Sequence, residues 1–230
     1  MQGWFKHGSI LDGNILCCRV SSQWQSTDWY HDPNQPDKSL LVEAATLRAT
    51  RSLGSGIRLF DEFFPQKIES SDARKALLDM TRHTPRDFLQ LLTHIQRFTT
   101  SSRPSLAEIK SGIRDYSIKY FLPEIQDELS GYASPDEISR MVTALGRVRK
   151  REFKMPELIG ASSGSAKPLS SERIYEILEA LFQCSALGNV KSGGSGNSIF
   201  TFKYRNRHST FNESETIILH RGLWKALNLV

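Results

Sequence analysis

Residues 84–95 have the sequence TPRDFLQLLTHI, the clearest helix signal in the chain. Threonine is a favoured N-cap residue, proline is favoured at the first helical position, and an acidic side chain suits the first turn. Apolar side chains then recur at the spacing of one helix face, at Phe88, Leu91, Leu92 and Ile95. The segment therefore predicts a capped amphipathic helix that packs into a helical core.

Helical patterns continue on both sides of this segment. Upstream, apolar residues at helical spacing begin at Leu40 and again at Ala73. Two turns separate these segments, at residues 54–56 and 59–65. Downstream, apolar residues over 106–129 predict one long helix or a pair of helices, with a kink or restart at Pro123. Residues 31–131 are therefore expected to form a helical bundle.

Residues 132–230 mix helices and strands. Helices are predicted from Ser134, around Leu158, over residues 170–185 and over residues 223–229, and strands over residues 199–205 and 216–220. A glycine-rich turn at residues 192–197 precedes the first of these strands. Three helices followed by a glycine-tipped β-hairpin is the order of a winged helix-turn-helix.

The basic excess lies in the last hundred residues. The chain has 30 Lys and Arg against 25 Asp and Glu, a formal net charge of +5. Residues 1–130 carry 16 side chains of each sign, so residues 131–230 carry 14 basic against 9 acidic ones. This asymmetry favours an anionic partner for the C-terminal region, either nucleic acid or an acidic protein surface. The alternative is a mildly basic, solvated surface.

The fold class predicted from these patterns is α+β and mainly helical. Residues 1–30 form an N-terminal remnant, whose apolar run at residues 15–20 is a strand that needs a partner. A helical bundle follows to residue 131, and residues 132–230 form a winged-helix-like domain with a β-hairpin. The boundary is placed at the turn of residues 131–135, where the charge balance also changes.

Several classes of function have no motif in this sequence. Neither phosphate-binding pattern, G-x-x-x-x-G-K-[ST] or G-x-G-x-x-G, occurs. The six histidines lack metal-binding spacing, and the three cysteines (Cys17, Cys18 and Cys184) form no C-x-x-C pair. No run reaches the roughly 18 apolar residues of a membrane span, and residues 1–7 lack a signal-peptide pattern. We therefore expect a cytoplasmic protein with no membrane partner, metal, cofactor or catalytic residues of its own.

Four stretches resemble parts of a known family. They are residues 28–30, 47–49, 59–65 and, most specifically, 81–92, whose sequence is TRHTPRDFLQLL. They resemble the region C-terminal to the nucleotide-binding core in prokaryotic P-loop ATPases of the AAA+/STAND class. The resemblance extends from about residue 25 to the end and is weaker at residues 202–206 and 220–223. It implies that the T-P-R-D helix belongs to a helical lid and that a winged-helix-like domain follows.

The chain departs from that family at the nucleotide-binding core. The phosphate-loop lysine and the acidic metal-binding strand have no counterpart, and residues 15–20 correspond at most to the last core strand. The chain thus resembles a lid and winged helix without the motor. Because phosphoryl transfer needs the phosphate cradle and the metal ligands together, we expect no nucleotide hydrolysis by this chain alone.

Arg86 is the candidate nucleotide-sensing residue. By the resemblance, an arginine in the first turn of the lid helix acts as a second sensor that reaches nucleotide phosphates. The guanidinium fork suits phosphate, and a helix N-terminus adds donors. The alternative is that Arg86 pairs with Asp79 or another acid and only stabilises the lid.

Basic side chains gather at two places in the C-terminal region. The candidate nucleic-acid-binding residues are Arg147, Arg149, Lys150, Arg151 and Lys154 in one set, and Lys203, Arg205 and Arg207 in the other. Both sets suit a phosphate backbone. Strand alternation places Phe200, Phe202 and Tyr204 on one face, where we expect them to pack against the core.

The helix predicted at residues 170–185 argues against reading of duplex DNA. Its polar side offers Glu172, Glu176 and Glu179 but only one base, Arg173. Three carboxylates in a phosphate-lined groove would be repelled. We therefore expect the winged helix to dock on protein, or to contact nucleic acid through the wing alone.

These observations lead to one functional hypothesis and two alternatives. The hypothesis is a non-catalytic regulatory or adaptor region that works with a P-loop ATPase core or subunit. The first alternative is a stand-alone winged-helix regulator that binds DNA. The second is a folded piece of a longer ATPase whose activity lies elsewhere.

Overall fold

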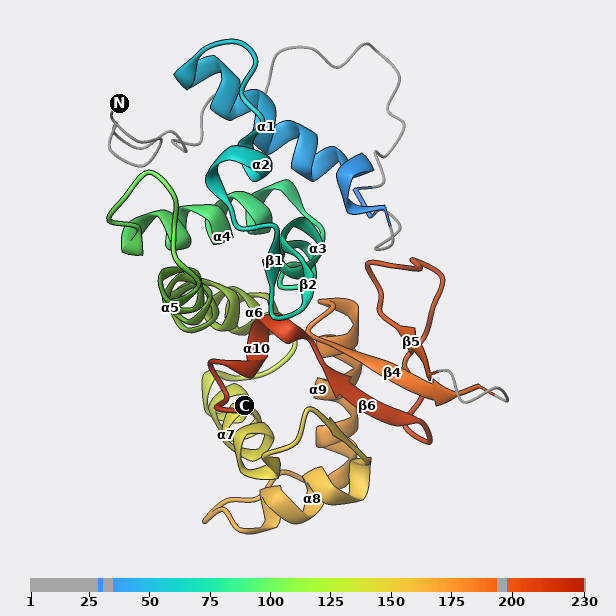
Figure 1. Cartoon of the computed structure of the whole chain (residues 1–230). Coiled ribbons are helices and arrows are strands. Elements are labelled where there is room, and N and C mark those ends of the chain that lie inside the picture. The colour runs from blue at the N-terminus through green and yellow to red at the C-terminus, as the bar shows by residue number, and fades with distance from the viewer. Residues whose placement is uncertain (1–28, 31–34, 194–197, 230) are drawn as a thin grey trace. The chain divides into compact units, whose positions relative to one another are not determined.

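A computed structural model describes residues 29–30, 35–193 and 198–229 and divides the chain into two compact units (Figure 1). Unit 1 is Met1–Tyr116 and unit 2 is Ser117–Val230. The boundary predicted from the sequence lies later, near residue 131. The predicted strand at residues 15–20, almost all of the N-terminal remnant and the tip of the glycine turn lie outside the described residues.

Unit 1 is built mainly from helices. Its described elements are η1 (Pro36–Lys38), α1 (Leu40–Leu53), α2 (Leu59–Phe63), β1 (Lys67–Ile68), β2 (Ser71–Asp72), α3 (Ala73–Leu78), α4 (Pro85–Phe98) and α5 (Leu106–Tyr116). The antiparallel pair β1 and β2 was not predicted. The helices predicted from Leu40, Ala73, Thr84 and Leu106 are confirmed. The aromatic segment at residues 59–65 forms the short helix α2 rather than a turn.

Helix α4 is the centre of unit 1. Its apolar face, Phe88, Leu91, Leu92 and Ile95, is at most 1% exposed. Helix α5 packs closely on it, because a Cβ at Gly112 would lie 2.4 Å from the Ile95 Cα. Any larger side chain at that position would push the two helices apart.

Aromatic rings complete the core of unit 1. The ring of Phe60 in α2 lies 5.2 Å from that of Phe64 and 6.1 Å from that of Phe88, between centroids. All three side chains are buried. Such stacked pairs contribute beyond the area they bury. The aromatic segment thus fills part of the helical core of unit 1.

Unit 2 combines helices with a four-stranded sheet. Its described elements are η2 (Ser117–Phe121), α6 (Leu122–Leu129), α7 (Pro135–Val148), β3 (Glu152–Phe153), α8 (Met155–Ser163), α9 (Ser171–Gln183), β4 (Leu187–Ser192), β5 (Ser198–Thr201), β6 (Thr216–Leu219) and α10 (Arg221–Trp224). The predicted kink or restart at Pro123 corresponds to a change of winding without a gap: the π-helical turn η2 follows α5 directly and leads into α6, which has Pro123 in its first turn. Proline lacks the backbone N–H that would continue the hydrogen-bond ladder of the helix. The mainly helical α+β class is confirmed.

The sheet of unit 2 has the strand order β3-β6-β4-β5, and every pair is antiparallel. The register places Phe153, Leu187, Ile217 and Leu219 on one face, and all four are at most 1% exposed. The opposite face carries a smaller apolar cluster of Val190, Ile218 and Phe202, with Tyr204 packed against it. Strand β5 is an edge of this sheet.

Three expectations for the C-terminal strands and helix differ from the structure. The strand predicted over residues 199–205 ends at Thr201, because the amides of Arg205 and Asn206 turn back to the Phe202 carbonyl at 3.1 and 3.2 Å. Phe200 is 40% exposed, so its predicted core packing is wrong. The closing helix begins earlier and is shorter than predicted.

Candidate functional site

The N-terminus of α4 is fixed by a buried ion pair that the sequence analysis missed. The Arg82 guanidinium donates from Nε to Asp87 Oδ2 at 2.9 Å and from Nη2 to Oδ1 at 3.2 Å. Arg82 is 8% exposed and Asp87 1%. Two parallel bonds from one guanidinium fix orientation as well as distance. The loop before α4 is therefore held rigidly against the first turn of the helix.

Arg86 projects from this fixed first turn. The Thr84 hydroxyl accepts the Asp87 amide at 3.1 Å, which confirms the predicted N-cap. Arg86 follows Pro85 in the helix and is exposed. A cation at this end of a helix is opposed by the macrodipole, whereas an anion is attracted to it. The arrangement presents a guanidinium beside a helix end that itself suits an anion.

A second buried polar pair joins α4 to α5. His94 Nδ1 lies 2.8 Å from Asp115 Oδ2, with His94 3% and Asp115 9% exposed. The Tyr116 ring meets the His94 ring edge-on, with 6.0 Å between centroids. All three groups are buried between helices, so we assign them to the packing of unit 1 rather than to a reaction.

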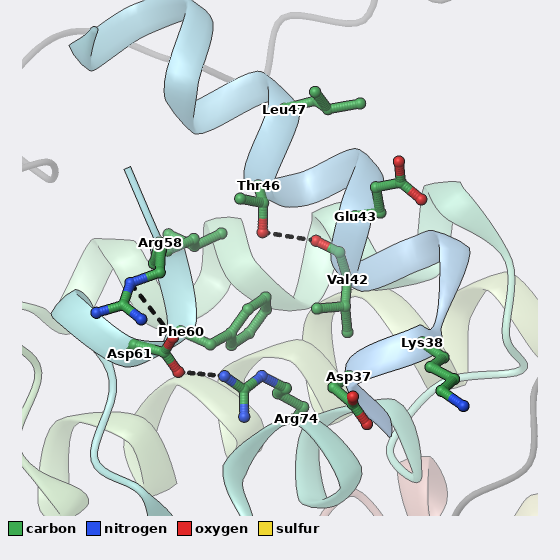
Figure 2. Close-up of a pocket in the computed structure, with 11 residues that line it drawn as sticks. Asp37, Lys38, Val42, Glu43, Thr46, Leu47, Arg58, Phe60, Asp61 and Arg74 are labelled. Carbon is green, nitrogen blue, oxygen red and sulfur yellow. Dashed lines mark hydrogen bonds and ion pairs between the residues drawn. The ribbon is translucent and has the colours of Figure 1, made fainter. Parts of the chain in front are cut away.

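A pocket of about 340 Å³ opens beside α1 (Figure 2). Its lining residues come from η1, α1, α2, α3 and the residue before α2: Asp37, Lys38, Val42, Glu43, Thr46, Leu47, Arg58, Leu59, Phe60, Asp61 and Arg74. Val42 and Phe60 give it an apolar floor, and Leu47 lies at its rim with 55% of its surface exposed. The charged groups of the lining are three acids and three bases.

The charges of this pocket are largely satisfied within unit 1. Arg74 forms ion pairs with Asp61 and, at 3.5 Å, with Asp72. Arg58 Nε lies 3.8 Å from Asp61 Oδ2, whereas Arg74 binds Oδ1. Figure 2 draws both ion pairs. Because Asp61 offsets both arginines, the pocket has no excess of positive charge for a nucleotide phosphate. It fits an apolar side chain of a partner better than an anion.

Three of the five residues in the first basic set of unit 2 are bound within the unit. Lys150 pairs with Glu157, and Lys154 Nζ donates to the Ser214 carbonyl at 2.9 Å. Arg151 Nε donates to the Leu229 carbonyl at 3.0 Å, and its guanidinium lies 4.1 Å from the Trp224 ring centroid. Each of these three bases thus has an internal partner. Arg147 and Arg149 are exposed at the end of α7.

The second basic set follows strand β5. Lys203 Nζ donates to the Ser209 carbonyl at 2.9 Å and is only partly exposed. The Arg205 guanidinium lies over the Phe202 and Tyr204 rings, 5.5 and 5.6 Å from their centroids. Arg207 is exposed. The structure therefore places the two predicted sets on different elements, the α7 to α8 connection and the turn after β5.

The outer side of α9 is acidic. Its one basic residue, Arg173, donates to Glu137 from Nε at 2.7 Å and from Nη2 at 3.1 Å, and also binds Glu176 and the Tyr132 carbonyl. Glu172, Glu176 and Glu179 remain exposed. With Arg173 engaged by carboxylates, α9 offers a phosphate backbone only repulsion.

The described residues contain no group of three or more His, Cys, Asp and Glu side chains placed to hold a metal ion. No membrane-spanning helix occurs in the part of the chain that the structure describes. The chain matches no protein-family model, and comparison with curated proteins and with solved structures likewise finds no match.

Proposed function

We propose that this chain is a non-catalytic regulatory region that works with a P-loop ATPase. Arg86 senses the nucleotide held by the partner, and unit 2 binds an anionic partner. The observation that carries the proposal is the first turn of α4, where the buried pair of Arg82 and Asp87 fixes the helix end and Arg86 is exposed. An exposed arginine on a rigid helix end suits a phosphate brought by another protein.

The surface of unit 1 supports a partner subunit. Leu40 and Leu47 on α1 are 44% and 55% exposed, and they lie seven residues apart, about two turns of one helix face. Leu47 also borders the pocket with the apolar floor. An exposed apolar stripe beside a pocket is typical of a surface that a protein partner covers.

The element order of unit 2 supports a winged-helix assignment. Helices α7, α8 and α9 precede β4 to β6, and β3 lies between the first two helices. In a winged helix-turn-helix the third helix is the recognition helix. Here that position belongs to α9, whose exposed side is acidic. The domain therefore serves a partner other than the duplex major groove.

The test is made on the complex as the cell contains it. The full-length chain is purified from its own cells and its masses are measured by native mass spectrometry. We expect a stoichiometric subunit that contains a phosphate-loop motif. In that complex R86A should weaken nucleotide binding about tenfold or more, since a charged hydrogen bond is lost. R86K should lose less, and R51A, at an exposed arginine of α1, should lose nothing.

Two results would overturn this function. One is a chain that occurs alone or only as copies of itself. The other is a complex whose nucleotide affinity is the same for R86A and the wild type. The second result would leave Arg86 with a role only in the lid.

A stand-alone DNA-binding regulator is the second candidate, and the element order of unit 2 favours it. The acidic side of α9 counts against it. A direct measurement is binding of the full chain to duplex DNA between about 50 and 200 mM salt, where contacts to several phosphates would produce a steep loss of affinity. A homodimer that binds duplex DNA tightly would replace the first proposal with this one.

A further inference from the structure

Strand β5 exposes two adjacent apolar side chains. Ile199 is 57% and Phe200 40% exposed, and among the large apolar residues exposed in the described ranges only these two are neighbours in sequence. Strand β5 pairs only with β4 and forms an edge of the sheet. Exposed apolar residues on a sheet edge are a liability unless something binds them.

The register shows what surrounds each of the two side chains. Ile199 lies opposite Lys191, and Phe200 lies opposite Val190. Val190 belongs to the small cluster with Phe202 and Ile218. Phe200 thus extends this apolar cluster to the exposed edge of the sheet. Ile199 lies on the other face of the sheet, beside Lys191.

The segment of the chain that contains this edge strand has basic residues but no acidic ones. Residues 180–212 contain four Lys and Arg and no Asp or Glu. Lys191 and Arg207 are exposed, and the Arg205 guanidinium lies over the Phe202 and Tyr204 rings. The edge at β5 thus combines cations with an exposed ring, and this combination is complementary to an anion that carries flat apolar groups.

We propose that strand β5, together with Lys191 of β4 and the turn after β5, binds single-stranded nucleic acid. Phe200 stacks on one base, and the bound strand passes over the sheet edge to contact Ile199 on the other face. Lys191, Arg205 and Arg207 contact the phosphates. The proposal rests on the proposed function, since it names the anionic partner of unit 2.

A single strand fits this surface better than the other anions. Stacking on Phe200 requires a base that is not already stacked and paired, which a single strand supplies. Duplex DNA would find no second contact surface on α9, whose exposed side is acidic and repels phosphates. An acidic peptide would use the cations but would leave the Phe200 ring without a flat partner.

The test uses fluorescence anisotropy of a labelled oligonucleotide of about 12 nucleotides with the full-length chain. We expect binding that weakens between about 50 and 200 mM salt, with a slope near −2 for about three phosphate contacts. F200A should weaken binding about 5- to 100-fold, and F200W should restore it. R207E and K191E should weaken binding and reduce the salt slope.

Matched controls lie in unit 1. F98A removes a similarly exposed aromatic residue, and R51E reverses an exposed charge on α1, and both should bind as the wild type does. Because Phe200 is exposed, F200A should keep the wild-type circular dichroism spectrum. A change in that spectrum moves the test to F200Y, which retains a ring and should bind like the wild type.

Three outcomes would overturn the inference. They are no binding at about 50 mM salt, equal affinity for F200A and the wild type, and tighter binding of duplex or of an acidic peptide than of the single strand. The two proposals fail separately. A chain that binds the oligonucleotide but has no phosphate-loop subunit refutes the proposed function alone. A chain with that subunit and no oligonucleotide binding refutes only this inference.

Discussion

Helices α4 and α7, one in each unit, begin with the same pattern. The sequences are Thr84-Pro85-Arg86-Asp87 and Ser134-Pro135-Asp136-Glu137: a hydroxyl cap, a proline, a charged residue and an acid. In both helices the cap oxygen accepts the amide of the acid, at 3.1 Å in α4 and 3.4 Å in α7. The same local chemistry therefore starts both helices.

The two acids then bind differently. Glu137 reaches back to the Ser134 amide at 2.9 Å, closing a capping box, and also accepts from Arg173 at the surface. Asp87 is one methylene shorter and is 1% exposed, and it binds Arg82 from the preceding loop. The pattern alone determines where each helix begins. Burial of the acid determines how much stability is lost when its arginine partner is removed.

The largest expected difference in stability is between the loss of Arg82 and the loss of Arg173. R82A leaves the Asp87 carboxylate buried without its guanidinium, a change that typically costs about 3–5 kcal/mol. R173A leaves Glu137 in contact with water, because the two side chains are already 28% and 22% exposed, and should cost far less than R82A. Hydrogen exchange of the α4 and α7 amides measures each loss where it occurs. Equal losses in the two helices would refute the contrast.

The next largest expected difference in stability is between glycine-to-alanine substitutions in the two units. At Gly112, which faces α4, an added Cβ would lie 2.4 Å from a backbone atom, so G112A should cost about 1–3 kcal/mol through overpacking. Gly146 in α7 has no atom within 4 Å of such a Cβ. G146A should therefore stabilise, by up to about 1 kcal/mol, through helix propensity. Urea unfolding of both variants gives the sign, and a destabilised G146A would show that α7 is also tightly packed.

The contrast also shows which parts of the fold the sequence could predict. Local signals were sufficient for α4, α7 and α9, each of which has a Ser or Thr cap that accepts a first-turn amide. Strand β4, Leu187–Ser192, was missed because Gly188 and Asn189 have low strand propensity. Pairing on both sides stabilises it, and Asn189 exchanges two hydrogen bonds with the Asn212 backbone, at 2.8 and 3.0 Å. These contacts join residues far apart in sequence.

The candidate sites were predicted less well than the helices. Arg86 lies on a confirmed helix start, but the buried partner of Asp87 could not be inferred without knowing which arginine the core covers. Alternation assigned Phe200 to the core, but its place on the edge strand β5 leaves it 40% exposed. One signal for that surface was present in the sequence, the lack of any acid over residues 180–212.

The loss of stability in acid should separate the contribution of Arg173 to the α7 cap from that of Ser134. Hydrogen bonds from Arg173, and then from Ser134, lower the pKa of Glu137 from 4.5 to about 2. In unit 1 the pKa of Glu108 is also lowered to about 2, by Ser105 and Thr100 without an arginine. Both carboxylates are more acidic when folded, so their stabilisation is present above pH 4.5 and is lost as the pH falls toward 2.

Urea midpoints measured across that pH range test this assignment. E137Q and E108Q should each flatten the loss of stability in acid. R173A should flatten it for unit 2 while Glu108 continues to titrate as before. If R173A left the acid dependence unchanged, the Ser134 bonds alone would account for the Glu137 pKa.

The smallest expected effect concerns the charged residue that follows each proline. Asp136 is favoured by the helix dipole and pairs with Arg140 at 2.8 Å, so D136A should destabilise by a few tenths of a kcal/mol. Arg86 stands where the dipole disfavours a cation, so the helix dipole by itself predicts that R86A leaves the midpoint unchanged or raises it slightly. Thermal and urea midpoints of the two variants give opposite signs if Arg86 is retained for binding a phosphate. If R86A lost as much stability as D136A, Arg86 would have a structural role, and its nucleotide-sensing role would lose its physical basis.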